Sequence, residues 1–188
     1  MAVYSSMLPL GTVAPDFSLP DVTAGKTIAL ADYRDRKALL VIFLCAHCPY
    51  VVHVQAELAR LARDYADQSL GIVGITSNDI ISFPMDSPQA TAEMARAAGL
   101  SFPILYDESQ QVAKSFTAAC TPDFFLFSPD RKLAYRGQLD ESRPSRGTPD
   151  GKDLRAAIDA VLSGGSVNPA QSPSIGCNVK WKPSGSGV

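Results

Sequence analysis

Two cysteines at close spacing carry the clearest chemical signal in this sequence of 188 residues. Cys45 and Cys48 follow an apolar run, Ala38 to Leu44, and precede a segment with helical periodicity. Two thiols at this spacing can close a disulfide within one turn, and a helix N-terminus stabilises the thiolate form of a cysteine. The pattern therefore predicts thiol–disulfide chemistry at a strand-to-helix junction.

His47 lies between the two cysteines and is a candidate for tuning them. An imidazole beside Cys45 stabilises its thiolate, and a more stable thiolate makes the corresponding disulfide more oxidising. The alternative is a solvent-facing histidine with little influence on either thiol. His53 falls among the polar positions of the following helical segment, so we expect no chemical role for it.

Composition limits the class of protein. The formal net charge of −2 comes from 17 basic and 19 acidic residues spread along the chain, which gives no sign of a nucleic-acid partner. No segment approaches the roughly 20 apolar residues that span a bilayer, so we expect no membrane partner. Residues 1–13 show no readable export signal, and we therefore expect a cytoplasmic protein.

Periodicity and turn residues predict an alternation of strands and helices. Apolar runs at residues 38–44 and 70–75 suit buried parallel strands, and the amphipathic segment 51–65 suits the helix between them. Pro49 fits the first helical turn, where a missing N–H costs little. The other expected elements are a hairpin-like piece within 11–30, a helix over about 88–98, a strand at 102–105, a short helix near 112–116, a hairpin of 124–127 with 132–136, and a last helix from Thr148-Pro149 to Gly164.

The final residues differ in composition, being rich in Ser, Gly and Pro. They nevertheless carry Ile175, Val179 and Trp181, whose apolar area favours partial docking on the rest of the protein. We therefore divide the chain into a domain over 1–165 and a tail over 166–188 that contains Cys177.

Several separate motifs, in the right order, make this sequence resemble the thioredoxin superfamily over roughly residues 11–162. It resembles most closely the peroxiredoxin-like proteins of that superfamily, which are related to AhpC/TSA and redoxin proteins. The matching segments are Cys-x-His-Cys-Pro-Tyr-Val at 45–51, Ser-Asn-Asp at 77–79, Cys-Thr-Pro-Asp-Phe-Phe at 120–125, Tyr-Arg-Gly at 135–137 and Gly-Cys-Asn-Val-Lys-Trp-Lys at 176–182. The resemblance implies an α/β, thioredoxin-like fold: a central mixed sheet flanked by helices, with an N-terminal β extension and a partly docked C-terminal tail.

The resemblance also implies roles for individual residues. Cys45 would be the nucleophile, nearer the helix start and more exposed, and Cys48 the resolving thiol. Pro122 matches the family's cis-proline, and the backbone of Thr121 would pair with an extended substrate as an added strand does. Pro49, beside Cys48, is expected to contact substrate as well.

Two further cysteines remain open in function. Cys120 is two residues before Pro122, so it is expected near the active pair, either as an additional redox thiol or as a small buried hydrophobe. Cys177 is either a relay for a disulfide, a partner of Cys120, or an inert thiol in the docked tail.

The leading hypothesis is a thiol–disulfide oxidoreductase that works without a cofactor on a protein or small-molecule disulfide, with a thioredoxin or glutathione system as reducing partner. The first alternative is a thiol-dependent peroxidase. Against it, the Pro-x-x-x-Thr-x-x-Cys pattern of typical peroxiredoxins is absent, since Ala38 and Ile42 occupy the corresponding positions before Cys45.

The second alternative is a metal-binding module that uses cysteine and histidine ligands. The candidate ligands are Cys45, Cys48, Cys120, Cys177 and His47. Structural zinc sites usually bring a second close pair of ligands, and this sequence has only one such pair, so we expect no metal.

Overall fold

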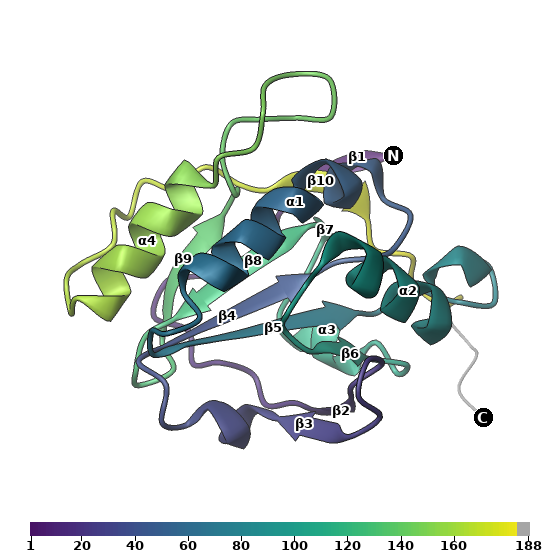
Figure 1. Ribbon diagram of the computed structural model, residues 1–188, viewed down its shortest axis with the longest axis horizontal. Helices are drawn as coiled ribbons and strands as arrows, with labels where there is room; N and C mark the ends of the chain where they lie inside the picture. Colours follow the sequence, from purple (N-terminus) through teal and green to yellow (C-terminus); the bar gives the residue numbers. More distant parts are fainter. Residues whose placement is uncertain (184–188) are drawn as a thin grey trace.

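A mixed five-stranded sheet forms the centre of the computed structural model, which describes residues 1–183 (Figure 1). Its strand order is β6-β5-β4-β8-β9. Strands β4, β5 and β6 are parallel, whereas β8 and β9 continue the sheet in antiparallel fashion from β4. Their bounds are β4 Ala38–Phe43, β5 Leu70–Thr76, β6 Ile104–Tyr106, β8 Asp123–Phe127 and β9 Leu133–Gly137.

The central strand β4 explains why its sequence lacks polar alternation. All six of its residues are buried, and successive side chains point to opposite faces of the sheet. Leu40 and Ile42 belong to one hydrophobic cluster, whereas Leu39, Val41 and Phe43 belong to another. Both faces of the sheet are therefore covered, as the apolar run predicts.

Helices cover the two faces unequally. The larger cluster includes residues of α1 (Pro49–Asp64), α2 (Pro88–Ala98) and α4 (Lys152–Leu162), which lie together in front of the sheet in Figure 1. The other cluster includes residues of the N-terminal segment and of the short helix α3 (Gln111–Ser115). That segment contains a hairpin of β2 (Ser18–Pro20) and β3 (Thr27–Ala29), followed by the 3-10 turn η1 (Leu30–Tyr33).

The helix predicted to begin at Thr148-Pro149 starts later, at Lys152, so that boundary was wrong. Gly151 precedes the helix with a φ of 69°, a conformation that glycine adopts readily. The carboxylate of Asp140 accepts hydrogen bonds from the N–H groups of Asp150 and Gly151, at 2.8 and 2.7 Å. These bonds hold residues 148–151 in the preceding loop instead of in a helical turn.

The tail docks as a strand in a second, three-stranded sheet. Strand β10 (Ile175–Asn178) lies between β1 (Ala2–Tyr4) and β7 (Cys120–Thr121) and is antiparallel to both. Val179 is buried and Trp181 remains 42% exposed, so the tail is partly docked, as predicted.

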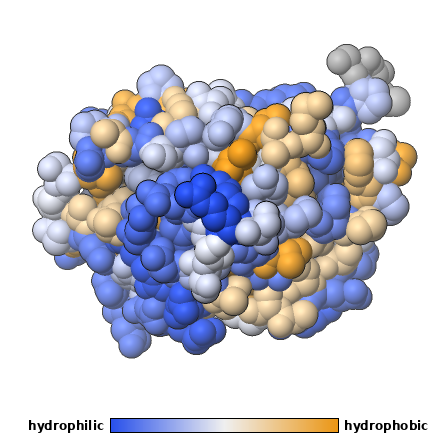
Figure 2. Space-filling model, turned by 90° about the horizontal axis from the view of Figure 1, so that it is seen from above, coloured by the Kyte–Doolittle hydropathy of each residue, from blue (hydrophilic) through white to orange (hydrophobic). Residues whose placement is uncertain are grey.

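The surface at this end of the molecule carries both hydrophobic and hydrophilic residues. Figure 2 looks down on it and shows hydrophobic residues in several groups separated by hydrophilic ones. Within residues 1–183, no helix combines the length and the apolar character needed to cross a bilayer.

Candidate active site

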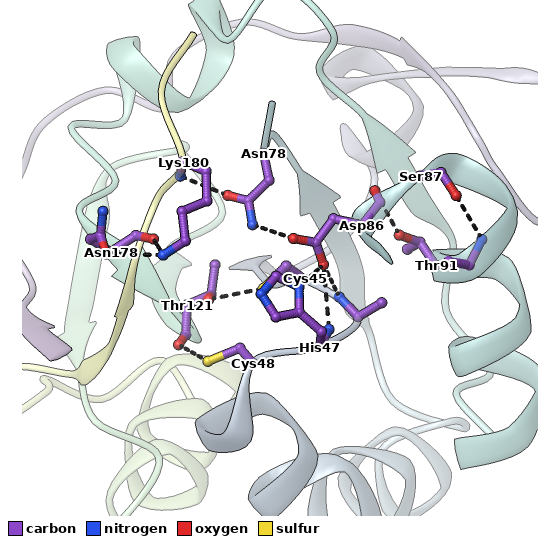
Figure 3. A network of polar contacts seen from close by, with 12 residues as sticks. Cys45, His47, Cys48, Asn78, Asp86, Ser87, Thr91, Thr121, Asn178 and Lys180 are labelled. Carbon is purple, nitrogen blue, oxygen red and sulfur yellow. Dashed lines mark hydrogen bonds and ion pairs between the residues drawn. The ribbon is translucent and has the colours of Figure 1, made fainter. Parts of the chain in front are cut away.

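The two close cysteines lie where β4 passes into α1 (Figure 3). Helix α1 begins at Pro49, the first-turn position predicted for it, and Cys48 is the N-cap residue. Cys45 is therefore farther from the helix start, and it is 1% exposed against 0% for Cys48. The expectation that Cys45 is nearer the helix start and appreciably more exposed was wrong, because the helix starts one residue after the second cysteine.

Thr121 lies across the pair. Its hydroxyl oxygen is 3.3 Å from the sulfur of Cys45, and the Cys48 thiol donates to its carbonyl oxygen at 3.1 Å. The Thr121–Pro122 peptide bond is cis, as the resemblance implied. The structure thus brings Cys45, Cys48, Thr121 and Pro122 together, as the sequence motifs predicted.

The thiols of Cys45 and Cys48 interact with each other, and their pKa values move apart. The interaction with Cys45 lowers the pKa of Cys48 to about 4 against the opposing effect of burial, and Cys177, the Thr121 side chain and the backbone N–H of Val51 lower it further. The interaction with Cys48, then burial and the nearby charge of Asp86, raises the pKa of Cys45. As a thiol, Cys48 donates to the Thr121 carbonyl, and it loses this hydrogen bond when it ionises.

Asp86 is a site residue that sequence reasoning missed. Its carboxylate is fully buried and accepts the N–H groups of Ala46 and His47, at 2.9 and 3.3 Å, and the Asn78 amide at 2.7 Å. It belongs to the 3-10 turn η2 (Pro84–Asp86), in a stretch without helical or strand periodicity. The only nearby signal was the Ser-Asn-Asp motif at 77–79, which marks the end of β5 but not the later aspartate.

His47 faces the same carboxylate. Its Nδ1 lies 2.8 Å from Oδ1 of Asp86, and its ring stacks on Phe83 with an interplanar angle of 4°. The side chain is 26% exposed, so the ring is held in place and not fully solvated. Asp86 therefore fixes the loop between the cysteines through both the backbone and the imidazole (Figure 3).

The edge of Thr121 is already occupied. Cys177 of β10 pairs with Thr121, and Asn178 pairs with Cys120. A Cβ atom on Gly176 would lie 2.0 Å from the Thr121 carbonyl oxygen, so only glycine permits this close approach. The expectation that Thr121 pairs with an extended substrate was wrong for this conformation, because the protein's own tail fills that position.

The remaining predicted residues differ in surroundings. Cys120 is fully buried, and burial followed by the charge of Asp123 raises the pKa of its thiol. Cys177 is partly exposed, and burial followed by its interaction with Cys48 raises the pKa of its thiol. Pro49 is exposed at the surface beside the pair. The Nε2 of His53 is hydrogen-bonded to the Ser142 hydroxyl at 3.0 Å, in agreement with a structural role.

One grouping in the described part of the chain has donor atoms suited to a metal ion. A sulfur of Cys45, a ring nitrogen of His47 and a carboxylate oxygen of Asp86 lie within 4.8 Å of one another. Structural zinc sites take four ligands, and here Asp86 already accepts two backbone N–H groups. Hydrogen bonding therefore accounts for this cluster.

Solved structures support the fold. A conserved protein of Geobacillus kaustophilus matches with a TM-score of 0.95 and 51% identity, covering 98% of each chain. The thioredoxin domain of a thiol-disulfide oxidoreductase from Bacteroides vulgatus matches with a TM-score of 0.65 at 19% identity, covering 82% of this chain and 99% of that one. The second match shows that the fold is thioredoxin-like.

Sequence relatives point to thiol redox chemistry. A Mycobacterium tuberculosis protein named as a peroxiredoxin is 30% identical over 114 residues, which are 61% of this chain and 67% of the relative. The thiol-disulfide oxidoreductase ResA of Geobacillus thermodenitrificans is 28% identical over 127 residues, 66% of each chain. The AhpC/TSA family model matches residues 10–136. This chain therefore belongs to the AhpC/TSA family and has a thioredoxin-like fold.

Proposed function

We propose that this protein is a thiol–disulfide oxidoreductase whose Cys45 and Cys48 interconvert between two thiols and one disulfide. The observation that carries the proposal is that one residue, Thr121, contacts both sulfurs at the N-terminus of α1, at 3.3 Å from Cys45 and 3.1 Å from Cys48. Sulfurs held on one residue need little movement to form a bond, and the low pKa of Cys48 favours the thiolate required for exchange.

The reaction proceeds by two successive displacements. A thiolate of the site attacks a substrate disulfide, bonds to one substrate sulfur and releases the other as a thiolate. A second cysteine of the site then attacks the mixed disulfide, so that Cys45 and Cys48 become joined and the substrate leaves reduced. The reverse sequence uses the protein disulfide as the oxidant.

The expected partners are disulfides of proteins or small molecules, and a thioredoxin or glutathione system that restores the thiols. We propose a cytoplasmic location on the same chemical grounds, since reduced cysteines persist there. Neither the reaction nor the mixed sheet around it calls for a metal or an organic cofactor.

A peroxidase is the second candidate, because relatives in the same family are named as peroxiredoxins. In that reaction a site thiolate attacks the peroxide O–O bond, becomes a sulfenic acid, and is resolved by a second thiol with loss of water. Ala38 and Ile42 in place of the Pro and Thr that typical peroxiredoxins carry make this the weaker proposal.

Exchange assays on the purified protein test the proposal. We expect the wild type to catalyse reduction of a protein disulfide such as that of insulin by dithiothreitol, and Cys45→Ser and Cys48→Ser to return the rate to that of dithiothreitol alone. Cys120→Ala, which changes a buried thiol beside the same site, is the matched control and should retain activity. Unchanged activity in both serine variants would rule out the proposal, and peroxide consumption lost in those variants would favour the peroxidase.

A further inference from the structure

The third cysteine at the site, Cys177, is placed by the tail in contact with the reactive pair. Cys177 pairs with Thr121, whose carbonyl accepts the thiol of Cys48 at 3.1 Å and whose hydroxyl lies 3.3 Å from the sulfur of Cys45. Cys48 interacts with both of the other cysteines, so the three thiols form a series with Cys48 in the middle. We propose that Cys177 is a third redox residue, which exchanges a disulfide with Cys48 and so connects the buried pair to an external dithiol. This inference rests on the function proposed above.

The tail holds Cys177 in this position through contacts on both sides. Its strand is paired with β1 on one edge and with β7 on the other. Beyond the strand, the backbone N–H of Lys180 donates to Asn78 at 2.9 Å, and its carbonyl accepts the N–H of Asp79 at 2.8 Å. The Gln110 side chain adds two further hydrogen bonds: it donates to the carbonyl of Lys180 and accepts from the N–H of Lys182. A sulfur fixed this way is preorganised for exchange with Cys48.

Because it is partly exposed to solvent, Cys177 can react with an external thiol, whereas the buried Cys45 and Cys48 cannot do so directly. Cys45 and Cys48 are 1% and 0% exposed, so an external thiol has no open route to either sulfur in this conformation. The edge at Thr121, where an extended partner would otherwise pair, is filled by β10 itself. Cys177 is the partly exposed member of the series and is the sulfur that a partner can reach.

The proposed exchange conserves atoms and electrons. Starting from the Cys45–Cys48 disulfide, the Cys177 thiolate attacks Cys48, the Cys48–Cys177 bond forms, and Cys45 leaves and takes up the proton that Cys177 released. A thiolate of the external dithiol then attacks Cys177 and displaces Cys48 as a thiolate. The second thiol of the reductant attacks the mixed disulfide and frees Cys177, so two electrons have passed from the dithiol to Cys45 and Cys48.

The electrostatics of the site favour both steps. Burial and the interaction with Cys48 raise the pKa of Cys177 to about 11, while Lys180 lowers it. A Cys48 sulfur in a disulfide carries no charge, so its effect disappears and Cys177 ionises more easily when it has to attack. In the second step Cys48 is the leaving group, and a thiol of low pKa leaves faster.

Trapping the proposed intermediate is the direct test. Cys45→Ser removes the competing partner of Cys48, and we expect this variant, oxidised with diamide, to yield a Cys48–Cys177 disulfide in peptide mapping by mass spectrometry. Adding Cys177→Ala should abolish that bond. In the otherwise native chain, Cys177→Ala should slow reduction of the Cys45–Cys48 disulfide by a dithiol protein such as thioredoxin at least tenfold, whereas Cys120→Ala should leave the rate unchanged.

The outcomes separate this inference from the function on which it depends. Absence of the Cys48–Cys177 bond in oxidised Cys45→Ser, or a wild-type rate of reduction in Cys177→Ala, would overturn the role of Cys177 while leaving exchange by the pair intact. Failure of the proposed function would instead show as a wild-type protein that forms no Cys45–Cys48 disulfide. Thermal unfolding of Cys177→Ala alongside Cys120→Ala checks that the tail variant remains folded.

Discussion

Cys48 and Cys45 differ in their neighbours more than in their exposure. Cys45, Cys177 and the first turn of α1 lower the pKa of Cys48, whereas Cys48, burial and the buried carboxylate of Asp86 raise the pKa of Cys45. The negative charge of a thiolate is therefore better stabilised on Cys48 than on Cys45. The spacing of the motif predicted a stabilised thiolate, and the resemblance placed it on Cys45. The contacts that favour Cys48 instead include Thr121 and Cys177, which are distant in sequence and were not predictable from the motif.

The thiolate assignment predicts a specific effect of Cys45→Ala. This change removes the neighbour that lowers the pKa of Cys48 most, so the pKa of Cys48 should rise from about 4 toward the ordinary value of a cysteine, near 8.5. Thiolate absorbance near 240 nm, followed against pH in the reduced protein, measures this midpoint. Cys45→Ser retains a hydroxyl donor and should shift the midpoint less. A midpoint that is the same in Cys45→Ala and the wild type would contradict the assignment.

The site residues that lie in short sequence motifs could be predicted, whereas those that reach the site through tertiary contacts could not. Cys45, Cys48 and Pro122 lie in short motifs that keep their meaning without tertiary information. Asp86 lies 38 residues beyond Cys48 in an aperiodic loop, and it reaches the site only because the chain after β5 folds back over the Cys45–Cys48 loop. Its role depends on tertiary contacts, which no local pattern encodes.

Helices and strands were likewise predictable where their sequence signals are local, and not where they depend on tertiary contacts. The helix α2 spans Pro88–Ala98, as predicted, because the Ser87 cap, the proline in the first turn and the C-terminal Gly99 are all local signals. The sheet formed by β1, β7 and β10 joins segments near both ends of the chain. Docking of the tail was predictable from its apolar residues, but its strand partners were not.

Gly176→Ala tests the close contact between β10 and β7. The added methyl group would collide with the Thr121 carbonyl, so we expect β10 to separate from β7 and expose Cys48. Alkylation of the reduced native protein by a maleimide, mapped by mass spectrometry, should then label Cys48 faster than in the wild type. Gly165→Ala is the matched control, because the nearest atom to its added Cβ is 3.4 Å away. Equal labelling of Cys48 in Gly176→Ala and the wild type would show that β10 does not protect the site.

The stability of the whole molecule depends on pH through Asp123, on β8 next to the cis-proline. Burial raises the pKa of its carboxyl group to about 7, and one of its oxygens has no hydrogen-bond partner. Between about pH 4 and 7 the unfolded chain releases this proton and the folded chain keeps it, so the contribution of Asp123 to the free energy of unfolding falls as pH rises and is lost above pH 7.

Asp123→Asn should remove this dependence. We expect the free energy of unfolding of the variant, relative to the wild type, to increase between about pH 4 and 7 by at most about 1.4 kcal/mol per pH unit. Urea unfolding of both proteins in the reduced state, across that range, provides the measurement. A difference that does not change with pH would mean that Asp123 ionises at its ordinary pKa in the folded protein.

The central claim is that Cys45 and Cys48 form a reversible disulfide, and a redox titration with peptide mapping tests it most directly. Wild-type protein equilibrated in glutathione buffers, quenched with acid and alkylated, should show one two-electron transition in which a Cys45–Cys48 disulfide is the main oxidised product. Cys48→Ser should lack that transition. If the two cysteines never become joined at any ratio of oxidised to reduced glutathione, the protein does not work by the exchange proposed for it.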